Sequence, residues 1–254
     1  MSGAIVYLVT GANRGIGFGL VAALAARPNT IVFAGARDPS AQALGDLAAK
    51  HTNLHPIKLT SADKADNDAA VAQIEKVAGR LDVIIANAAI CDYYGPVVDA
   101  PVSVYQDHFE VNSLGPLVLF QAAERLLLAS PTGAPIFAVI SSSVTSMGNY
   151  VHFSLSPYAM SKAAVNILVK GLNAEHSKLV AFLVDPGWVA TQMGDRGAKA
   201  NGLPGAPVQI ADSVKGILGR IDGATKEKSA GKFWNAVVAN NGNPWDRPTE
   251  EILW

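Results

Sequence analysis

The chain alternates between short runs of almost entirely apolar residues and longer segments with a helical pattern. Six of the apolar runs have the length of a strand: Ile5 to Thr10, Thr30 to Gly35, Leu54 to Leu59, Val83 to Asn87, Ile136 to Ser141 and Val180 to Asp185. Strands that are apolar on both faces and are separated by helices are typical of a parallel sheet. The pattern therefore predicts an α/β fold with a doubly wound parallel sheet of about seven strands and helices on both faces.

The same pattern indicates how the rest of the chain is organised. No internal repeat, low-complexity tract or change in composition is visible, so residues 1–254 are predicted to form a single domain. Residues 190–207 contain several glycines and two prolines, which predicts a mobile loop over the substrate site. Residues 231–254 are expected to supply the last strand and a tail.

Composition narrows the classes of partner. Half of the 254 residues are apolar and 16% are charged, which is ample for one large core. The formal net charge of -1 gives no general attraction to nucleic acid or to an anionic membrane. No apolar run reaches the ~18 residues of a membrane span, and the N-terminal run lacks the basic flank of a signal peptide. The single cysteine, Cys91, forms no internal disulfide and has no visible activating neighbour. We expect a cytoplasmic protein without a metal site.

The first apolar run leads into TGANRGIG at residues 10–17. Gly11, Gly15 and Gly17 allow a sharp turn and a close approach to a pyrophosphate, whose charge then lies at the N-terminus of the next helix. The preceding strand and following helix supply the context that such a motif requires. The spacing is T-G-x-x-x-G-x-G rather than the usual G-x-G-x-x-G. The segment predicts a Rossmann-type dinucleotide-binding fold.

The end of the second predicted strand indicates which dinucleotide is bound. An acidic residue normally binds the ribose hydroxyls of NAD at this point, but Ala36 and Arg37 stand here and Asp38 follows. A guanidinium can pair with a 2'-phosphate through two hydrogen bonds, and Arg14 in the glycine loop is a candidate second contact. The alternative is a pair of solvated arginines. NADPH is favoured over NADH, with Asp38 as the feature that leaves NAD open.

The segment SPYAMSKAAV, residues 156–165, places Tyr158 four residues before Lys162. Residues four apart lie on the same face of a helix, and such pairs also arise by coincidence. The pair becomes informative only beside the other motifs of the chain.

Further short motifs follow in order: NAA at 87–89, VNSLG at 111–115, VISSS at 139–143, YAMSK at 158–162 and DPGWVAT at 185–191. With the glycine loop, and in this order and spacing, they resemble the short-chain dehydrogenase/reductase family over essentially the whole length. The resemblance is strongest to small carbonyl reductases and to fungal ketoreductases that act on aromatic polyketides. The segments GARDP at 35–39 and PGWVATQM at 186–193 and the ending TEEILW carry this finer placement.

The resemblance implies a hydride transfer to a carbonyl group, which needs a proton donor beside the carbonyl oxygen. Tyr158 matches the family's donor. Lys162 matches the cation that lowers the phenol pKa from ~10 by ~1 to 3 units and holds the nicotinamide ribose. Ser142 matches the serine that orients the carbonyl, with Ser143 as the alternative because a shift of one residue is easily imagined. Asn112 matches the asparagine of a water-borne proton relay; alternatively, it is a buried amide that ties a helix to a strand.

The resemblance also implies a cofactor bed. Asn87 would stabilise the central strand and approach the adenine-side ribose, and Pro186 and Gly187 would turn the chain after the sixth strand. The backbone of Val189 and the hydroxyl of Thr191 would meet the nicotinamide carboxamide. The implied cofactor-binding residues are Gly11, Asn13, Arg14, Gly15, Ile16, Gly17, Arg37, Ser61, Asn87, Tyr158, Lys162, Pro186, Gly187, Val189 and Thr191.

Several positions depart from the family pattern. Thr60 and Ser61 stand where an aspartate usually meets the adenine, so a hydroxyl would make that contact. Ala89 replaces a glycine. Thr145 replaces the glycine that usually follows the active serine by three residues, which blurs the assignment of Ser142.

Large aromatic and sulfur-containing residues are candidates for an apolar or aromatic substrate pocket, with core packing as the alternative for each. They are Tyr93, Tyr94, Phe153, Trp188 and Met193. Trp234, Trp245 and Trp254 crowd the C-terminal region and are assigned to packing or a subunit contact. The family implies a homodimer or homotetramer formed through long helices around residues 102–130 and 158–177, with Pro116 kinking the first.

The sequence therefore predicts an NADPH-dependent oxidoreductase that reduces a ketone or aldehyde and has a small carbonyl compound as its partner. One alternative is a catalytically silent NADP-binding sensor or regulatory module, since fold does not imply activity. Another is an NAD-dependent alcohol dehydrogenase that works in the oxidative direction. A sugar-nucleotide epimerase would share Tyr-x-x-x-Lys, but that family has a different glycine spacing and a longer chain.

Overall fold

The structure is a computed structural model that describes residues 3–238 and 249–254, and Trp245 lies outside these ranges. The strands in the described residues form one parallel sheet in the order β3-β2-β1-β4-β5-β6-β7. They are β1 (Ile5–Thr10), β2 (Thr30–Ala36), β3 (Leu54–Lys58), β4 (Val83–Ala86), β5 (Ile136–Ile140), β6 (Val180–Asp185) and β7 (Phe233–Asn235). The strand order reverses between β1 and β4, which is where open α/β sheets bind ligands, beyond the carboxyl ends of the strands.

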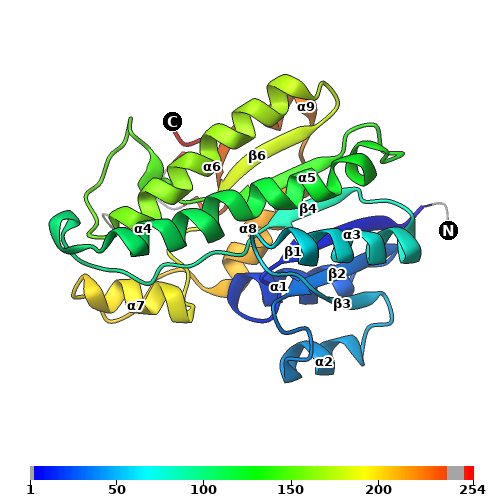
Figure 1. Cartoon of the computed structure of the whole chain (residues 1–254), viewed down its shortest axis with the longest axis horizontal. Coiled ribbons are helices and arrows are strands. Elements are labelled where there is room, and N and C mark those ends of the chain that lie inside the picture. Colours follow the sequence, from blue (N-terminus) through cyan, green and yellow to red (C-terminus); the bar gives the residue numbers. More distant parts are fainter. Residues whose placement is uncertain (1–2, 239–248) are drawn as a thin grey trace.

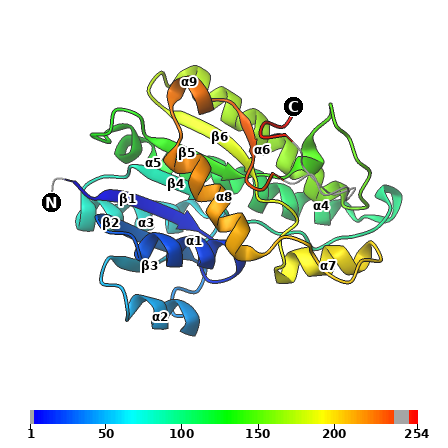
Figure 2. The ribbon, with the colours of Figure 1, turned by 180° about the vertical axis from the view of Figure 1, so that it is seen from behind.

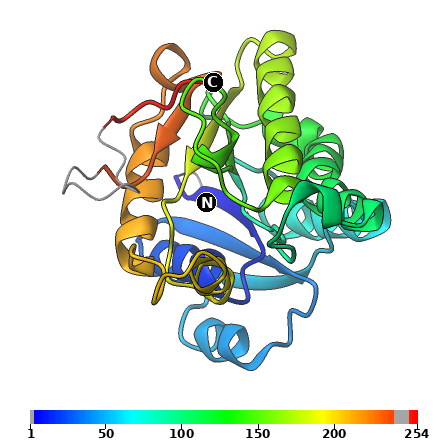
Figure 3. The same cartoon turned by 90° about the vertical axis from the view of Figure 1, so that its left-hand side faces the viewer.

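Helices cover both faces of this sheet. The helices α3, α4, α5 and α6 lie on the face toward the viewer in Figure 1, and α1 and α8 lie on the face toward the viewer in Figure 2. Figure 3 shows the sheet between these two layers. The helices are α1 (Gly15–Ala25), α2 (Gln42–Ala48), α3 (Lys64–Ala78), α4 (Val102–Phe109), α5 (Gly115–Leu128), α6 (Ser156–Glu175), α7 (Gln192–Ala200), α8 (Ile210–Asp222) and α9 (Lys226–Ser229). Three short turns are η1 (Val97–Asp99), η2 (Glu110–Leu114) and η3 (Ser143–Thr145).

The predicted α/β fold with a doubly wound parallel sheet is confirmed. The ends of the predicted strands agree with the structure to within one residue, and β7 is the seventh strand. One prediction is wrong, because residues 190–207 contain α7 and are not a loop throughout. The hydroxyl of Thr191 caps this helix by accepting a hydrogen bond from Gly194 N (3.1 Å). Oδ1 of Asp195 then accepts one from Ala206 N (3.1 Å) and fixes the returning chain.

The predicted long helix over residues 102–130 is interrupted. Helix α4 ends at Phe109, the backbone passes through the π-helical turn η2, and α5 begins at Gly115. Pro116 lies in the first turn of α5 and is not a kink within one helix. Because proline has no N–H, the carbonyl of Asn112, four residues earlier, receives no α-helical hydrogen bond from it. This missing bond favours the wider turn, which is a feature often found at functional sites.

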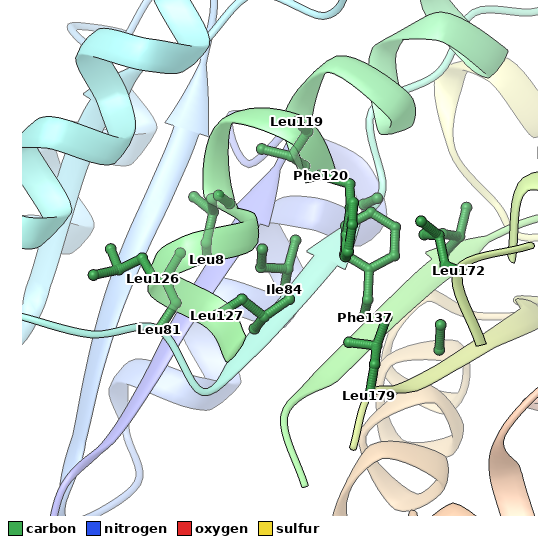
Figure 4. Close-up of a cluster of buried hydrophobic side chains, with 14 of the residues drawn as sticks. Leu8, Leu81, Ile84, Leu119, Phe120, Leu126, Leu127, Phe137, Leu172 and Leu179 are labelled. Carbon is green, nitrogen blue, oxygen red and sulfur yellow. The ribbon is translucent and has the colours of Figure 1, made fainter. Parts of the chain in front are cut away.

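The hydrophobic core consists of two clusters, one on each face of the sheet. Figure 4 shows part of the cluster under α5 and α6, where Leu8, Ile84 and Phe137 from three neighbouring strands meet Phe120 and Leu127 of α5. All five side chains are almost completely buried, and full burial of such a side chain contributes about 1.5–3 kcal/mol. The second cluster packs α1 and α8 against the other face.

Residues 249–254 pack beside β7. Ile252 N donates to Phe233 O (2.7 Å), so residues 249–254 run along the edge of the sheet. The Trp254 ring contacts the Phe233 ring (centroids 6.0 Å apart) and lies 3.9 Å from Nζ of Lys170. Trp254 therefore packs against its own chain. Within residues 3–238 and 249–254, no helix has the length and apolarity that a membrane crossing requires.

Gly17 tests how closely α1 packs against the loop after β1. A Cβ atom at this position would lie 2.2 Å from Gly11 O and 2.6 Å from Asn87 Nδ2, distances that real Cβ atoms do not adopt. We expect Gly17→Ala to lower the free energy of unfolding by about 1–3 kcal/mol, as overpacking does. Urea unfolding provides the measurement. The control is Gly45→Ala in α2, where the new Cβ meets nothing within 4 Å and stability should rise. Equal stability of Gly17→Ala and wild type would contradict this packing.

Candidate active site

A cavity of about 440 Å³ opens at the carboxyl ends of the strands. Its wall combines the glycine loop after β1, the end of β2, the loop after β4, the end of β5, the start of α6 and the segment after β6. The predicted site residues in this wall are Gly11, Asn13, Arg14, Gly15, Ile16, Arg37, Ser61, Asn87, Ser142, Tyr158, Lys162, Pro186, Gly187, Val189 and Thr191. Gly17 and Asn112 are not in the wall; both are buried behind it.

The glycine loop has the backbone geometry that a pyrophosphate requires. Gly11 and Gly15 have φ values of 65° and 56°, in the region that favours glycine. Helix α1 begins after Arg14 without a side-chain cap and without an acidic residue in its first turn. Its first N–H groups are therefore open to a phosphate. The loop is held from behind, because Asn87 Nδ2 donates to Thr10 O (2.8 Å).

Two arginines lie at the end of the cavity beside β2. Arg37 and Arg14 both line the cavity and are both exposed. Nη1 of Arg14 donates to Oε1 of Gln192 (2.7 Å), which joins the glycine loop to α7. Asp38 lies outside the wall and accepts hydrogen bonds from Ser40 N (2.9 Å) and Ser40 Oγ (2.5 Å), which hold the pKa of its carboxyl below the usual value. The charged side chains in the wall at this end are therefore positive.

Helix α6 places Tyr158 and Lys162 one turn apart in the cavity wall. Lys162 is only 1% exposed, and its Nζ donates to the main-chain oxygen of Ile140, the last residue of β5 (2.6 Å). Burial lowers the pKa of Lys162 from 10.5 to about 8. At neutral pH a buried ammonium thus joins α6 to the end of β5.

The Tyr158 phenol holds its proton firmly. Burial raises the pKa of Tyr158. The nearby Cys91 and Asp185 side chains raise this pKa further, whereas the Ser142 hydroxyl lowers it. The net direction is upward because burial dominates, and a lowering of this pKa by Lys162 stays a prediction. A protonated phenol is the state that a proton donor needs.

The two candidate serines follow β5 directly. Both Ser142 and Ser143 line the cavity. Ser142 has an extended backbone, and its Oγ accepts a hydrogen bond from Val144 N (3.5 Å). Ser142 lies close enough to the Tyr158 phenol to lower its pKa, which supports Ser142 as the serine that works with Tyr158, and the choice between Ser142 and Ser143 stays a prediction.

The Asn112 side chain is fully buried and fully engaged. Its Nδ2 donates to Ile90 O (2.9 Å) and Ser161 Oγ (3.0 Å), and its Oδ1 accepts from Ile90 N (2.8 Å). The amide therefore ties η2 to the loop after β4 and to α6, which is the alternative the sequence left open. A proton relay through Asn112 would have to use its main-chain carbonyl, and this role stays a prediction.

Aromatic and sulfur-containing side chains line the cavity beside the loop after β4, the loop after β5, the segment after β6 and α7. Phe153 and Trp188 meet edge to face, with ring centroids 5.9 Å apart and planes at 86°. The hydroxyl of Tyr94 donates to the main-chain oxygens of Cys91 and Met193, both at 3.3 Å, and so joins the loop after β4 to α7. Four of the five predicted pocket residues therefore lie in the wall.

The structure corrects one pocket residue and adds another. Tyr93 is not in the wall, because its hydroxyl turns away to donate to Pro96 O (2.7 Å). Arg196 is in the wall and was missed; its guanidinium forms an ion pair with Asp92 (3.1 Å) in the loop after β4. Its position three residues after Met193 on α7 was the available signal, but it is visible only once α7 is known to be a helix.

Cys91 lies in the wall but is not activated. Burial raises the pKa of its thiol to about 11, so the thiol stays uncharged at neutral pH. In the part of the chain that the structure describes, no group of three or more His, Cys, Asp or Glu side chains is arranged to hold a metal ion.

The sheet order, the glycine loop and the position of the cavity define a doubly wound protein of the dinucleotide-binding class. The short chain dehydrogenase family model matches residues 5–201, and the chain belongs to this family of oxidoreductases. The resemblance found in the sequence is thereby confirmed.

Relatives and solved structures place the chain more closely. It is 40% identical over 256 residues to the norsolorinic acid ketoreductase of Aspergillus parasiticus, which covers 94% of this chain and 91% of the relative. A norsolorinic acid ketoreductase of Dothistroma septosporum is 41% identical over 249 residues, with 94% and 92% covered. The NADPH-bound carbonyl reductase from chicken fatty liver has 30% identity and a TM-score of 0.79, with 92% and 96% covered. Carbonyl reductase Sniffer of D. melanogaster has 27% identity and a TM-score of 0.84, with 99% and 100% covered.

Replacing Lys162 by Met removes the buried charge. A lysine pKa lowered from 10.5 to about 8 corresponds to about 3 kcal/mol of destabilisation below pH 8. Because the unfolded chain binds more protons than the folded chain between these two pKa values, this destabilisation disappears as the pH rises from 8 to 10.5. We therefore expect the stability of Lys162→Met relative to wild type, measured by urea unfolding, to be highest at pH 7 and to fall by about 3 kcal/mol toward pH 10.5.

The lost hydrogen bond to Ile140 O lowers the stability of Lys162→Met by about 1–3 kcal/mol at every pH. This loss does not change how the stability difference between variant and wild type depends on pH. A difference between variant and wild type that stays constant from pH 7 to pH 10.5 would contradict the lowered pKa of Lys162.

Proposed function

We propose that the protein catalyses the NADPH-dependent reduction of a ketone or aldehyde carried by an apolar or aromatic compound. The observation that carries this proposal is the meeting of Tyr158, Ser142 and the buried Lys162 in one cavity wall. The ketoreductases with 40% and 41% identity and the carbonyl reductase solved with NADPH support it. The aromatic side chains in the cavity wall support an apolar or aromatic substrate.

The chain's own residues manage the charge that develops on the carbonyl oxygen. Bound NADPH supplies the hydride. The Ser142 hydroxyl donates a hydrogen bond to the carbonyl oxygen, and Tyr158 transfers its phenolic proton to that oxygen as negative charge appears. Lys162, which is still an ammonium at neutral pH, then stabilises the phenolate. Water held at the Asn112 carbonyl would return a proton toward Lys162.

The segment after β6 is suited to hold the nicotinamide end. Gly187 turns the chain with a φ of 82°, and Thr191 is fixed as the cap of α7. In this proposal Val189 and Thr191 bind the carboxamide, while Ser61 and Asn87 lie toward the adenosine. We assign all 254 residues to one such domain, and we place it in the cytoplasm, where Cys91 stays reduced.

Tyr158→Phe tests the reaction itself. The variant keeps the ring but has no proton to give, and we expect turnover to fall at least 100-fold, the scale of general acid catalysis. The measurement is NADPH oxidation at 340 nm against aldehydes, diketones, quinones and aromatic ketones. Tyr93→Phe, whose hydroxyl lies outside the cavity, is the matched control and should keep wild-type turnover.

Two results would reject the proposed reaction. One is full activity of Tyr158→Phe. The other is a wild-type protein that binds NADPH tightly and reduces nothing on the panel, which would point to the cofactor-sensing module. Turnover only with NAD and an alcohol would indicate an NAD-dependent alcohol dehydrogenase that works in the oxidative direction.

Arg37→Ala tests the choice of cofactor. A charge-assisted pair with a 2'-phosphate contributes about 1.5–3 kcal/mol, so we expect NADPH affinity to fall about 10- to 100-fold while NADH affinity changes little. Fluorescence titration with both cofactors gives the two dissociation constants. Asp38→Asn is the control, because Ser40 already holds this carboxyl outside the wall. A shift toward NADH in the control alone would assign the selectivity to Asp38.

The protein is proposed to be a homodimer or homotetramer through α4 and α6, which lie side by side (Figure 1). Exposed apolar residues recur seven positions apart on both helices, at Val102 and Phe109 and at Met160 and Ile167. We expect Ile167→Glu to reduce the molar mass measured by light scattering to that of a monomer. Val77→Glu, at an exposed position of α3, should leave it unchanged. A wild-type monomer would contradict the assembly.

A further inference from the structure

A chain of three short hydrogen bonds lies beneath Ser142. Ser141 Oγ donates to Asn166 Oδ1 (2.7 Å), Asn166 Nδ2 donates to Thr145 Oγ1 (2.8 Å), and Thr145 Oγ1 donates to Ser142 O (2.8 Å). Ser141, Asn166 and Thr145 are 0%, 5% and 8% exposed. The chain thus starts and ends on neighbouring residues after β5 and passes through one amide of α6.

Each donor and acceptor in this chain is fixed by the group at its end. The Ser142 main-chain oxygen can only accept, so Thr145 must give its hydroxyl proton there. Thr145 Oγ1 must therefore accept from Nδ2 of Asn166, which turns Oδ1 of the amide toward the Ser141 hydroxyl. A single arrangement of donors and acceptors satisfies the hydrogen bonds of all three side chains, so this series of hydrogen bonds has one stable geometry.

The hydrogen-bond chain joins the two elements that carry the reacting groups. Asn166 lies one turn after Lys162 on α6, the helix that begins with Tyr158. Lys162 holds the end of β5 through Ile140 O, and Asn166 holds the next turn of chain through Thr145. The distance between the serine loop and the tyrosine helix is therefore set by two consecutive turns of α6.

The same loop is also held from its other side. Ser146 Oγ donates to Leu253 O (2.6 Å), and Gly148 N donates to Trp254 O (3.1 Å). The loop is thus fixed beyond Thr145, and Ser141 N donates to Val184 O (2.8 Å) at its start. The contact of Thr145 with Asn166 adds a side-chain tie between these two points.

We propose that Thr145 and Asn166 are positioning residues that set the Ser142 hydroxyl against the substrate carbonyl and the Tyr158 phenol. This inference rests on the proposed reductase function. Thr145 departs from the glycine usual at this position, and its hydroxyl gives Asn166 a partner that a glycine cannot offer. A misplacement of about 1 Å in an active site can reduce the rate about 100-fold, so a loosened serine loop lowers turnover without removing any reacting group.

The test compares Thr145→Val, Thr145→Ser and Asn166→Ala with Asn173→Ala. Valine has the shape of threonine without the hydroxyl, and serine restores the hydroxyl. Asn173 is the matched control: it lies two turns further along α6, is not in the cavity wall, and ties this helix to β6 through Ala181 O (2.6 Å). Turnover is measured per active site, with sites counted by NADPH titration, so that loss of folded protein does not lower the value.

We expect Thr145→Val and Asn166→Ala each to lower kcat about tenfold with unchanged NADPH affinity. Thr145→Ser should restore most of the rate. A double variant that combines Thr145→Val with Asn166→Ala should be no slower than Thr145→Val alone, because both residues act through the same series of hydrogen bonds. Asn173→Ala should lose stability but keep its kcat per site. Wild-type kcat in Thr145→Val, or a Thr145→Ser variant as slow as Thr145→Val, would overturn the inference.

Ser142→Ala separates this inference from the proposed function. If Ser142→Ala is slow while Thr145→Val is not, the reaction stands and the positioning role fails. If Ser142→Ala reduces carbonyls at the wild-type rate, the role of Ser142 fails and the positioning role with it.

Discussion

A buried positive charge joins helix α6 to the end of strand β5 in the cavity wall. The Lys162 ammonium lies between α6 and β5, and Ile140 O at the end of β5 accepts its hydrogen bond. Removing an ammonium from water costs several kcal/mol, so the structure keeps this group only with a well-placed partner. The pKa of Lys162 is lowered because burial destabilises the charged form of the side chain. The places of Tyr158 and Ser142 follow from it, since one stands a turn before Lys162 and the other two residues after Ile140.

The cavity wall combines chemically different groups. Arg14 and Arg37 lie beside the ends of β1 and β2, near an uncapped helix start, a combination suited to phosphate groups. Elsewhere in the wall Phe153 and Trp188 form an edge-to-face aromatic pair. The parallel sheet brings these groups together because the loops after its strands gather at one edge.

The sheet was predictable from the sequence because its strands are buried on both faces, so that runs such as those of β1 and β6 have no polar interruption. The glycine loop, Tyr158 and Lys162 were predictable because their spacing along the chain is itself the signal. The contact of Thr145 with Asn166 was not, since it joins residues 21 positions apart whose pairing depends on how α6 lies on β5. The upward pKa of Tyr158 escaped prediction for a similar reason, because burial is a property of the whole fold.

The most direct measurement is an NMR pH titration of the protein with isotope-labelled lysine side chains, in which the Lys162 signal is identified by its absence from Lys162→Met. A buried ammonium between α6 and β5 requires this signal to titrate near pH 8, well below the other lysines. If the Lys162 amine stays protonated up to pH 10.5, the lysine is solvated. That result would contradict the arrangement of Tyr158 and Ser142 around a buried charge.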